Sequence, residues 1–132
     1  MHVIPFPKFE HLRSGMPISE LQDEHLEWAQ YNFDPNSRKP IMMVLGIVEE
    51  MGELAHAILK GEQGIRGTQE KFDIIAKDAI GDMFVFMMGF CNARGWSLEN
   101  IVLETWGRVR QRNWRLSKED GGDSTPTTQG KK

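Results

Sequence analysis

The chain has 132 residues, of which 39% are hydrophobic and 27% are charged, and its formal net charge is −3. This length predicts one soluble domain with its own core, and it is too short for two independent cores. The acidic balance argues against a broad surface for polymeric nucleic acid. The most apolar run, residues 83–90, is far shorter than the ~20 residues that a bilayer requires, so no membrane span is expected.

Cysteine usage gives an expectation about the compartment. The single cysteine, Cys91, excludes an internal disulfide framework and fits a reducing cytoplasm, although a secreted protein without disulfides has the same composition. The first fifteen residues lack the basic start and apolar stretch of a signal peptide. We therefore expect a cytoplasmic location.

The first half of the chain contains two predicted helices. Ser19 and Gln22 resemble a capping box, which opens a helix that runs to about Phe33 with Leu21, Trp28 and Ala29 facing inward. Pro40 suits the first turn of a second helix. The apolar face of this second helix, which ends at Gly61, comprises Ile41, Val44, Leu45, Val48, Met51, Ala55 and Ile58.

Two more helices follow a glycine-rich loop at residues 61–68. The third is predicted from about Gln69 to Arg94, where Gly95 ends it. Its expected buried side comprises Phe72, Ile75, Ala79, Ile80, Met83, Met87 and Phe90. Ser97 is a good N-cap for the fourth helix. The expected inward stripe of the fourth helix comprises Ile101, Val102, Trp106 and Val109.

The predicted organisation is an all-α fold, a bundle of about four or five helices. Residues 1–18 are expected to form an N-terminal extension and residues 19–116 the helical domain. Residues 117–132 are polar, rich in Gly, Ser and Thr, and lack apolar anchors. This composition predicts a disordered tail.

Acidic residues interrupt the apolar pattern of two consecutive helices. Glu49, Glu50 and Glu53 lie three and four residues apart, which places them on about one third of the helix circumference. Asp78 and Asp82 form a second pair, four residues apart, on the third helix. If the two helices are antiparallel neighbours, these carboxylates converge. Two carboxylates ~4 Å apart repel by roughly 4 kcal/mol at an effective dielectric near 20, so the arrangement requires cations.

The donor type predicts the cation. Carboxylates without cysteine favour hard ions that prefer oxygen, namely Mg²⁺ or Mn²⁺, over zinc or copper. Such ions keep waters and bind phosphate oxygens, so the cluster is expected to be half of a phosphate-handling site. The alternative is an ordinary solvated helix face, which is common for glutamates on helices.

Basic residues are the candidates for the phosphate groups. Arg108, Arg112 and Arg115 share one face if the fourth helix continues past them, and guanidinium groups clamp phosphate oxygens in pairs. The alternative is a basic last turn that complements the helix dipole. Lys60 and Lys77, near the loop, are further candidates.

The candidates for a base pocket lie in the first helix. His25, Trp28 and Asn32 fall within two turns, and Trp28 and Asn32 are one turn apart. A stacking ring beside an amide would suit a nucleobase. A tryptophan at such a position is otherwise a core residue.

The two acidic segments together, residues 48–61 and 77–90, resemble the MazG-like all-α nucleoside triphosphate pyrophosphatases, whose signature is EExxE on one helix and ExxD on the next. The resemblance covers roughly residues 21–115. Glu49, Glu50 and Glu53 match the first motif, and Asp82 matches the last position of the second. Ala79 stands where the family has glutamate, and Asp78 is expected to replace it as a ligand.

The resemblance implies Mg²⁺-dependent hydrolysis of a nucleoside triphosphate to the monophosphate and pyrophosphate, in a symmetric dimer or tetramer. It also implies that Trp28 and Asn32 help to form the nucleoside pocket, and that Glu49 or Glu50 orients or deprotonates the attacking water. Residues 112–114, with Arg112 and Asn113 as candidate substrate contacts, are similar to the end of small phage-borne members, some of which prefer guanine nucleotides. dGTP or GTP is therefore the first candidate substrate.

Two other functions fit parts of the sequence. Glu53 and His56 form the Glu-x-x-His pair of diiron bundles, but no second pair is found on another helix. A non-enzymatic alternative is a helical regulatory module that binds a nucleotide or a partner protein without turnover, inactive because of Ala79.

Overall fold

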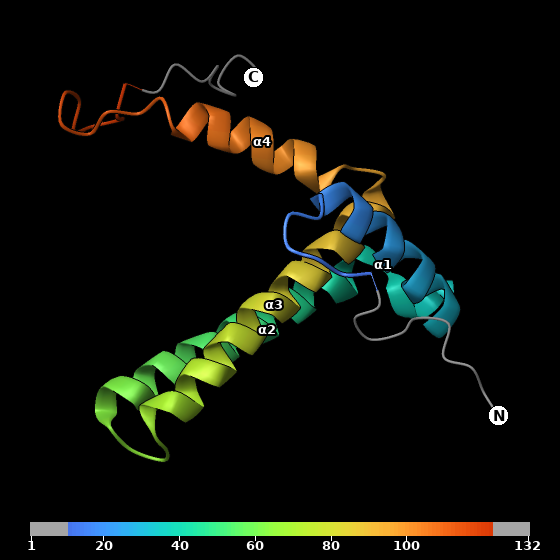
Figure 1. Cartoon of the computed structure of the whole chain (residues 1–132), viewed down its shortest axis with the longest axis horizontal. Helices are drawn as coiled ribbons and strands as arrows, with labels where there is room; N and C mark the ends of the chain where they lie inside the picture. Colours follow the sequence, from blue (N-terminus) through green and yellow to red (C-terminus); the bar gives the residue numbers. More distant parts are fainter. Residues whose placement is uncertain (1–10, 123–132) are drawn as a thin grey trace. The chain divides into compact units, whose positions relative to one another are not determined.

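The computed structural model describes residues 11–122, and these form four α-helices, one short 3₁₀ helix and no β-strand (Figure 1). The helices are α1 (Ile18–Asn32), α2 (Pro40–Gln63), α3 (Gln69–Arg94) and α4 (Leu98–Val109), and the 3₁₀ helix η1 (Pro35–Arg38) joins α1 to α2. The predicted all-α fold is confirmed for this part of the chain. Residues 1–10 of the expected extension and 123–132 of the expected tail lie outside the described residues.

Two compact units make up the chain, Met1–Leu98 and Glu99–Lys132. The first unit contains α1, η1, α2 and α3, and the second contains α4 after its first residue. In the first unit α2 and α3 pack side by side as an antiparallel hairpin, and α1 packs against α3 (Figure 1). Within residues 11–122, no helix is long and apolar enough to cross a membrane.

Local signals set the ends of α2 and α3. The Thr68 hydroxyl accepts a hydrogen bond from the Lys71 amide at 3.2 Å, so α3 begins with a side-chain cap. Gly64 and Gly95 follow the two helices with φ of 67° and 68°, the left-handed conformation that closes a helix most easily with glycine. The predicted end of α2 at Gly61 is wrong, because the left-handed residue is Gly64.

The buried face of α3 agrees with prediction at three positions. Phe72, Ala79 and Met83 are buried, and Phe72 and Ala79 lie less than 5% exposed. Ile80 was expected on this face, but it is 54% exposed because α3 turns it away from α2. The stripe expected to face inward on α4 is likewise exposed at Ile101, Val102 and Trp106.

α2 presents two opposite faces. Glu50 and Ala57 are buried, and a Cβ at Gly46 would lie 2.6 Å from the Phe86 ring, so this face lies against α3. The apolar face predicted from the sequence is exposed, and we call it the α2 seam: Ile41, Val44, Leu45, Val48, Met51, Ala55 and Ile58. Five of these side chains are between 53% and 63% exposed.

Gln22 connects α1 to the end of α3. Its amide nitrogen donates to Asn92 Oδ1 at 2.9 Å and to the Trp96 carbonyl at 2.7 Å, and its Oε1 accepts from the Leu98 amide at 2.9 Å. The predicted capping box is therefore wrong: the residue before α1 is Pro17, no side chain caps the helix, and Gln22 is buried. Met88, Cys91 and Leu98 form an apolar cluster beside this network.

Candidate metal centre and adjoining cavity

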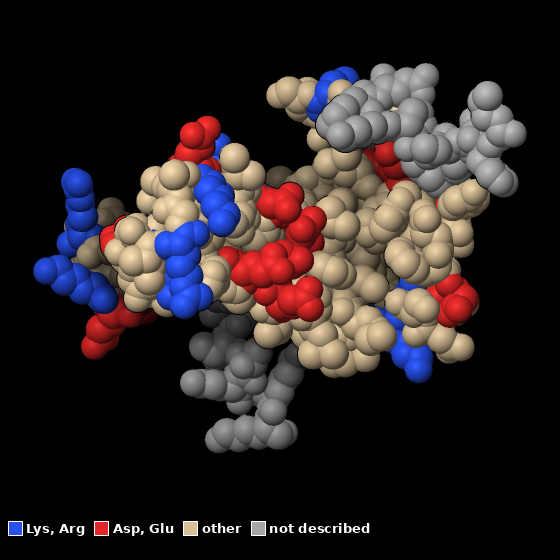
Figure 2. Space-filling model, turned by 90° about the horizontal axis from the view of Figure 1, so that it is seen from below, with Lys and Arg blue, Asp and Glu red and all other residues tan. Residues whose placement is uncertain are grey.

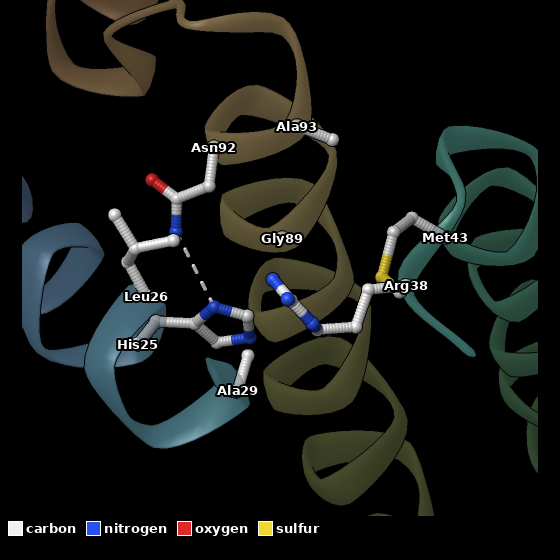
Figure 3. Close-up of a pocket in the computed structure, with 8 residues that line it drawn as sticks. All are labelled: His25, Leu26, Ala29, Arg38, Met43, Gly89, Asn92 and Ala93. Atoms are coloured by element: carbon white, nitrogen blue, oxygen red, sulfur yellow. Dashed lines mark hydrogen bonds between the residues drawn. The ribbon is translucent and has the colours of Figure 1, made fainter. Parts of the chain in front are cut away.

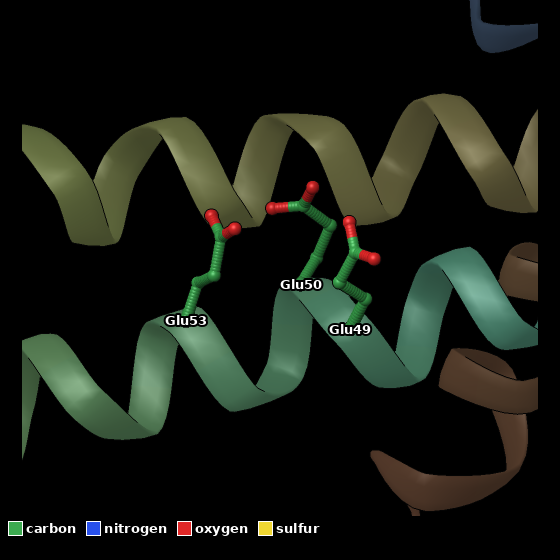
Figure 4. Close-up of side chains that lie close together, drawn as sticks. All are labelled: Glu49, Glu50 and Glu53. Atoms are coloured by element: carbon green, nitrogen blue, oxygen red, sulfur yellow. The ribbon is translucent and has the colours of Figure 1, made fainter.

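Three glutamates of α2 bring their carboxylates together beside α3 (Figure 4). One carboxylate oxygen from each of Glu49, Glu50 and Glu53 lies within 4.8 Å of the other two. Helical periodicity causes this convergence, because residues three and four apart share a face. The convergence of these three residues predicted from their spacing is confirmed.

Glu50 differs from its two neighbours by its burial. Glu49 and Glu53 are exposed, whereas Glu50 is 8% exposed and, within residues 11–122, its Oε2 has no hydrogen-bond partner. Burial raises the pKa of Glu50, and the negative charges of Glu53, Asp82 and Glu49 and a side-chain hydrogen bond with Glu53 raise it further. A buried carboxylate oxygen without a donor is costly, so a cation at this position would relieve both the burial and the repulsion.

Neither aspartate of α3 belongs to the group of mutually close ligand atoms, and both are exposed. Asp82 is the nearer to this group, because its charge acts on Glu50 and both side chains line the same cavity. The roles of Asp78 and Asp82 as ligands stay predictions. Ala79, at the position where the family signature has glutamate, is 1% exposed.

The donor set fits a hard divalent cation. All of its members are carboxylates, which are the ligands that Mg²⁺ and Mn²⁺ prefer. The buried oxygen of Glu50 without a partner is an observation independent of the acidic composition. Figure 2 shows that acidic side chains gather in a patch on the face of the molecule that it presents.

A cavity of about 330 Å³ adjoins the cluster in the first unit. Glu50 and Asp82 lie at its acidic part, and His25 and Arg38 are its other polar side chains. The rest of the lining is apolar, and half of it is aromatic: Trp28, Ala29, Phe33, Met43, Val85 and Phe86. This volume falls in the range of sites for small organic ligands.

Two of the three predicted base-pocket residues line this cavity. His25 and Trp28 both contribute, with their ring centroids 5.6 Å apart. Asn32 is not among the lining residues, and its amide donates back to the Trp28 carbonyl at 2.9 Å. Trp28 is 37% exposed, so the alternative that this tryptophan is a core residue is wrong.

The sequence did not predict that Phe33 and Arg38 line this cavity. Both lie beside the Asp34–Pro35 break between two helices, where no helical periodicity indicates which way a side chain points. Arg38 reaches the cavity because η1 turns the chain back, and its Nε donates to the Phe33 carbonyl at 3.2 Å. A lone arginine in a short loop gave no signal of this role.

The remaining candidates of the first unit lie outside the lining. Lys60 donates to Gln63 Oε1 at 2.9 Å, and Lys77 is exposed. His56, half of the considered diiron pair, is exposed and is not part of the carboxylate group.

The second unit contains the other predicted phosphate contacts. α4 ends at Val109, so the prediction that Arg108, Arg112 and Arg115 share one helical face is wrong. The Asn113 side chain accepts hydrogen bonds from the backbone amides of Arg115 and Leu116 at 3.1 and 3.3 Å, which favours a turn over continued helix.

Comparison with known proteins found no matching family model and no matching curated protein.

Proposed function

We propose that this protein is a nucleoside triphosphate diphosphatase that uses Mg²⁺ or Mn²⁺ and releases a nucleoside monophosphate and pyrophosphate. The observation that carries the proposal is the buried oxygen of Glu50, unpartnered within a group of convergent carboxylates at the edge of a cavity lined by aromatic rings. A site for a nucleoside triphosphate needs carboxylates that bind the cations on its phosphates and aromatic rings that pack against its base.

The metal ligands in this proposal are Glu49, Glu50, Glu53 and Asp82, with Asp78 as an additional candidate. A bound divalent ion would neutralise charge on the triphosphate and lower the pKa of a bound water. Glu49 or Glu50 orients or deprotonates the attacking water, since both lie in the cluster. Trp28, Phe33 and Phe86 bury the nucleoside and exclude water from it.

The resemblance to MazG-like enzymes supports the same reaction and suggests dGTP or GTP as first substrates. It also suggests a dimer or tetramer and, for a phage protein, a location in the cytoplasm of the host. The exposed α2 seam supports self-association, since contiguous apolar surface of this kind marks an interface.

The test is hydrolysis of eight ribo- and deoxyribonucleoside triphosphates with Mg²⁺ or Mn²⁺, with separate detection of pyrophosphate and orthophosphate. We expect pyrophosphate and monophosphate in equal amounts. Orthophosphate as the sole inorganic product would contradict the cleavage site. Binding without any product would instead favour the regulatory module.

A further inference from the structure

The polar groups of the cavity divide between two ends. Glu50 and Asp82 lie at one end, whereas His25 and Arg38 also line a smaller cavity of about 60 Å³ that extends to Gly89, Asn92 and Ala93 (Figure 3). Along α3, Gly89 and Asn92 lie roughly 10 and 15 Å from Asp82, at 1.5 Å per residue. This spacing leaves room for a sugar and its first phosphate between the two ends.

The protonation of His25 follows from its neighbours. Asn92 Oδ1 accepts from the Gln22 amide at 2.9 Å, and Asn92 Nδ2 donates to the Gln22 carbonyl at 3.1 Å, so the orientation of the Asn92 amide is fixed. The same Nδ2 faces His25 Nδ1 at 3.4 Å (Figure 3). His25 Nδ1 is therefore the acceptor, and its proton lies on Nε2. Burial lowers the pKa of His25, which favours the neutral form of the ring.

Arg38 supplies the second donor group. Its Nε is held by the Phe33 carbonyl, and within residues 11–122 no hydrogen bond or ion pair occupies its two terminal nitrogens. Arg38 and His25 thus line the same space with N–H groups, and neither offers an acceptor there. The acceptor side chains of the larger cavity, Glu50 and Asp82, lie at its other, acidic end.

Gly89 keeps this end open. A Cβ at Gly89 would lie 2.9 Å from Met43 Sδ and 3.1 Å from His25 Cε1. The space beside the His25 ring therefore depends on the absence of a side chain at this position.

We propose that His25 and Arg38 form a donor pocket that recognises a base through the carbonyl oxygen at purine position 6 or pyrimidine position 4, so that the site selects hypoxanthine, guanine or uracil over adenine and cytosine, which carry an amino group at that position. This inference rests on the proposed function and specifies its substrate class. A site built from donors rejects the amino analogue because an N–H group then meets an N–H group.

The experiment compares inosine and adenosine triphosphates, which differ at the purine 6-position as carbonyl and amino forms. Dissociation constants are measured by calorimetry with their uncleavable α,β-methylene analogues in Mg²⁺, and kcat/KM with the natural forms. We expect the inosine analogue to bind at least about tenfold tighter, the contribution of a charged hydrogen bond. Arg38→Gln should reduce this ratio to less than about threefold, with Arg38→Lys as a second variant in case the first does not fold.

Arg13→Gln is the matched control, because Arg13 lies on the exposed surface and pairs with Glu20 at 3.6 Å. It should preserve the ratio. Equal binding of the two analogues, or tighter binding of the adenosine form, would overturn the donor pocket and leave the proposed hydrolase standing. A tenfold preference without turnover would support the pocket and contradict the hydrolase. Binding of neither analogue would overturn both.

Discussion

Glu50 is the residue whose environment most needs a cation. Its folded-state pKa lies above the unfolded value of about 4.3, so the folded state binds more protons between these two pKa values. Stability without metal is therefore greatest below the unfolded pKa and decreases as pH rises through the folded pKa. We expect the melting temperature of the metal-free protein to fall over this window, and that of Glu50→Gln to fall less. Equal pH slopes for the two proteins would contradict this account.

Metal addition gives the complementary prediction. Mg²⁺ or Mn²⁺ should raise the melting temperature of the wild type, because a ligand that binds only the folded state stabilises it. Glu50→Gln should lose this shift and reduce kcat/KM by about 100-fold or more. Glu62→Gln, an exposed position on the same helix, is the control and should retain both properties. A metal shift preserved in Glu50→Gln would place the ion elsewhere.

The two aspartates of α3 provide a matched pair. Both are exposed, but only Asp82 lines the cavity and acts electrostatically on Glu50, and Asp78 lies one turn away. We expect Asp82→Asn to reduce kcat/KM by about 100-fold and Asp78→Asn by less than tenfold, since only the first shares the cavity with Glu50. Equal losses, measured at saturating Mg²⁺, would assign Asp78 the ligand role of the glutamate that Ala79 replaces.

Sequence reasoning found the acidic half of the site better than its other half. The convergence of Glu49, Glu50 and Glu53 was predictable because helical spacing alone determines which side chains of one helix share a face. Arg38 was not, because its direction depends on how η1 turns. Gln22 was assigned to a local cap, whereas its amide satisfies groups seventy or more residues away. Long-range hydrogen bonds leave no periodic trace in a sequence.

The contact between α2 and α3 depends on one glycine. A Cβ at Gly46 would lie 2.6 Å from the Phe86 ring, whereas a Cβ at Gly52 would meet nothing within 4 Å. Gly46→Ala should lower the free energy of unfolding by about 1–3 kcal/mol through overpacking. Gly52→Ala, the control in the same helix, should raise it by about 0.5–1 kcal/mol. Denaturant titration measures both changes, and stabilisation by Gly46→Ala would show that Phe86 moves aside without cost.

The sequence predicted a helix boundary correctly where the local signal was unambiguous. Both ends of α3 were predicted correctly, because Gly95 is the single nearby residue that would end the helix and the apolar pattern begins directly after the loop. The end of α2 was displaced because Gly61, Gly64 and Gly67 are equivalent in a propensity argument, and only the structure shows which one is left-handed. The end of α4 was missed because the chain turns there through backbone hydrogen bonds, from the Gln111 amide to the Arg108 carbonyl at 3.2 Å and from the Arg112 amide to the Val109 carbonyl at 3.0 Å, which no sequence pattern indicates.

The whole molecule exposes an apolar surface that predicts self-association. The α2 seam contains Ile41, Val44, Val48, Met51, Ala55 and Ile58, an a/d heptad spacing with no charged member. A standard interface covers roughly 800 Å² per partner, and a seam about 26 Å long on each of two chains supplies an area of this order. We expect light scattering to give at least twice the 15.2 kDa chain mass.

Val48→Asp should shift this assembly toward the monomer, because Val48 is central to the seam and 63% exposed. Leu116→Asp, which places the same charge at an exposed apolar position of the second unit, should leave the mass unchanged. A monomeric wild type would contradict self-association through the α2 seam.

Cys91 lies in the apolar cluster with Met88 and Leu98, and burial raises the pKa of its thiol. Because the thiolate is the reactive form, a maleimide or disulfide reagent should modify this sulfur only when the junction of α1 with the end of α3 transiently opens. The protein thus carries a native kinetic reporter of that opening. Loss of the Gln22 amide, as in Gln22→Ala, should accelerate alkylation by at least about tenfold if the buried network holds the junction closed.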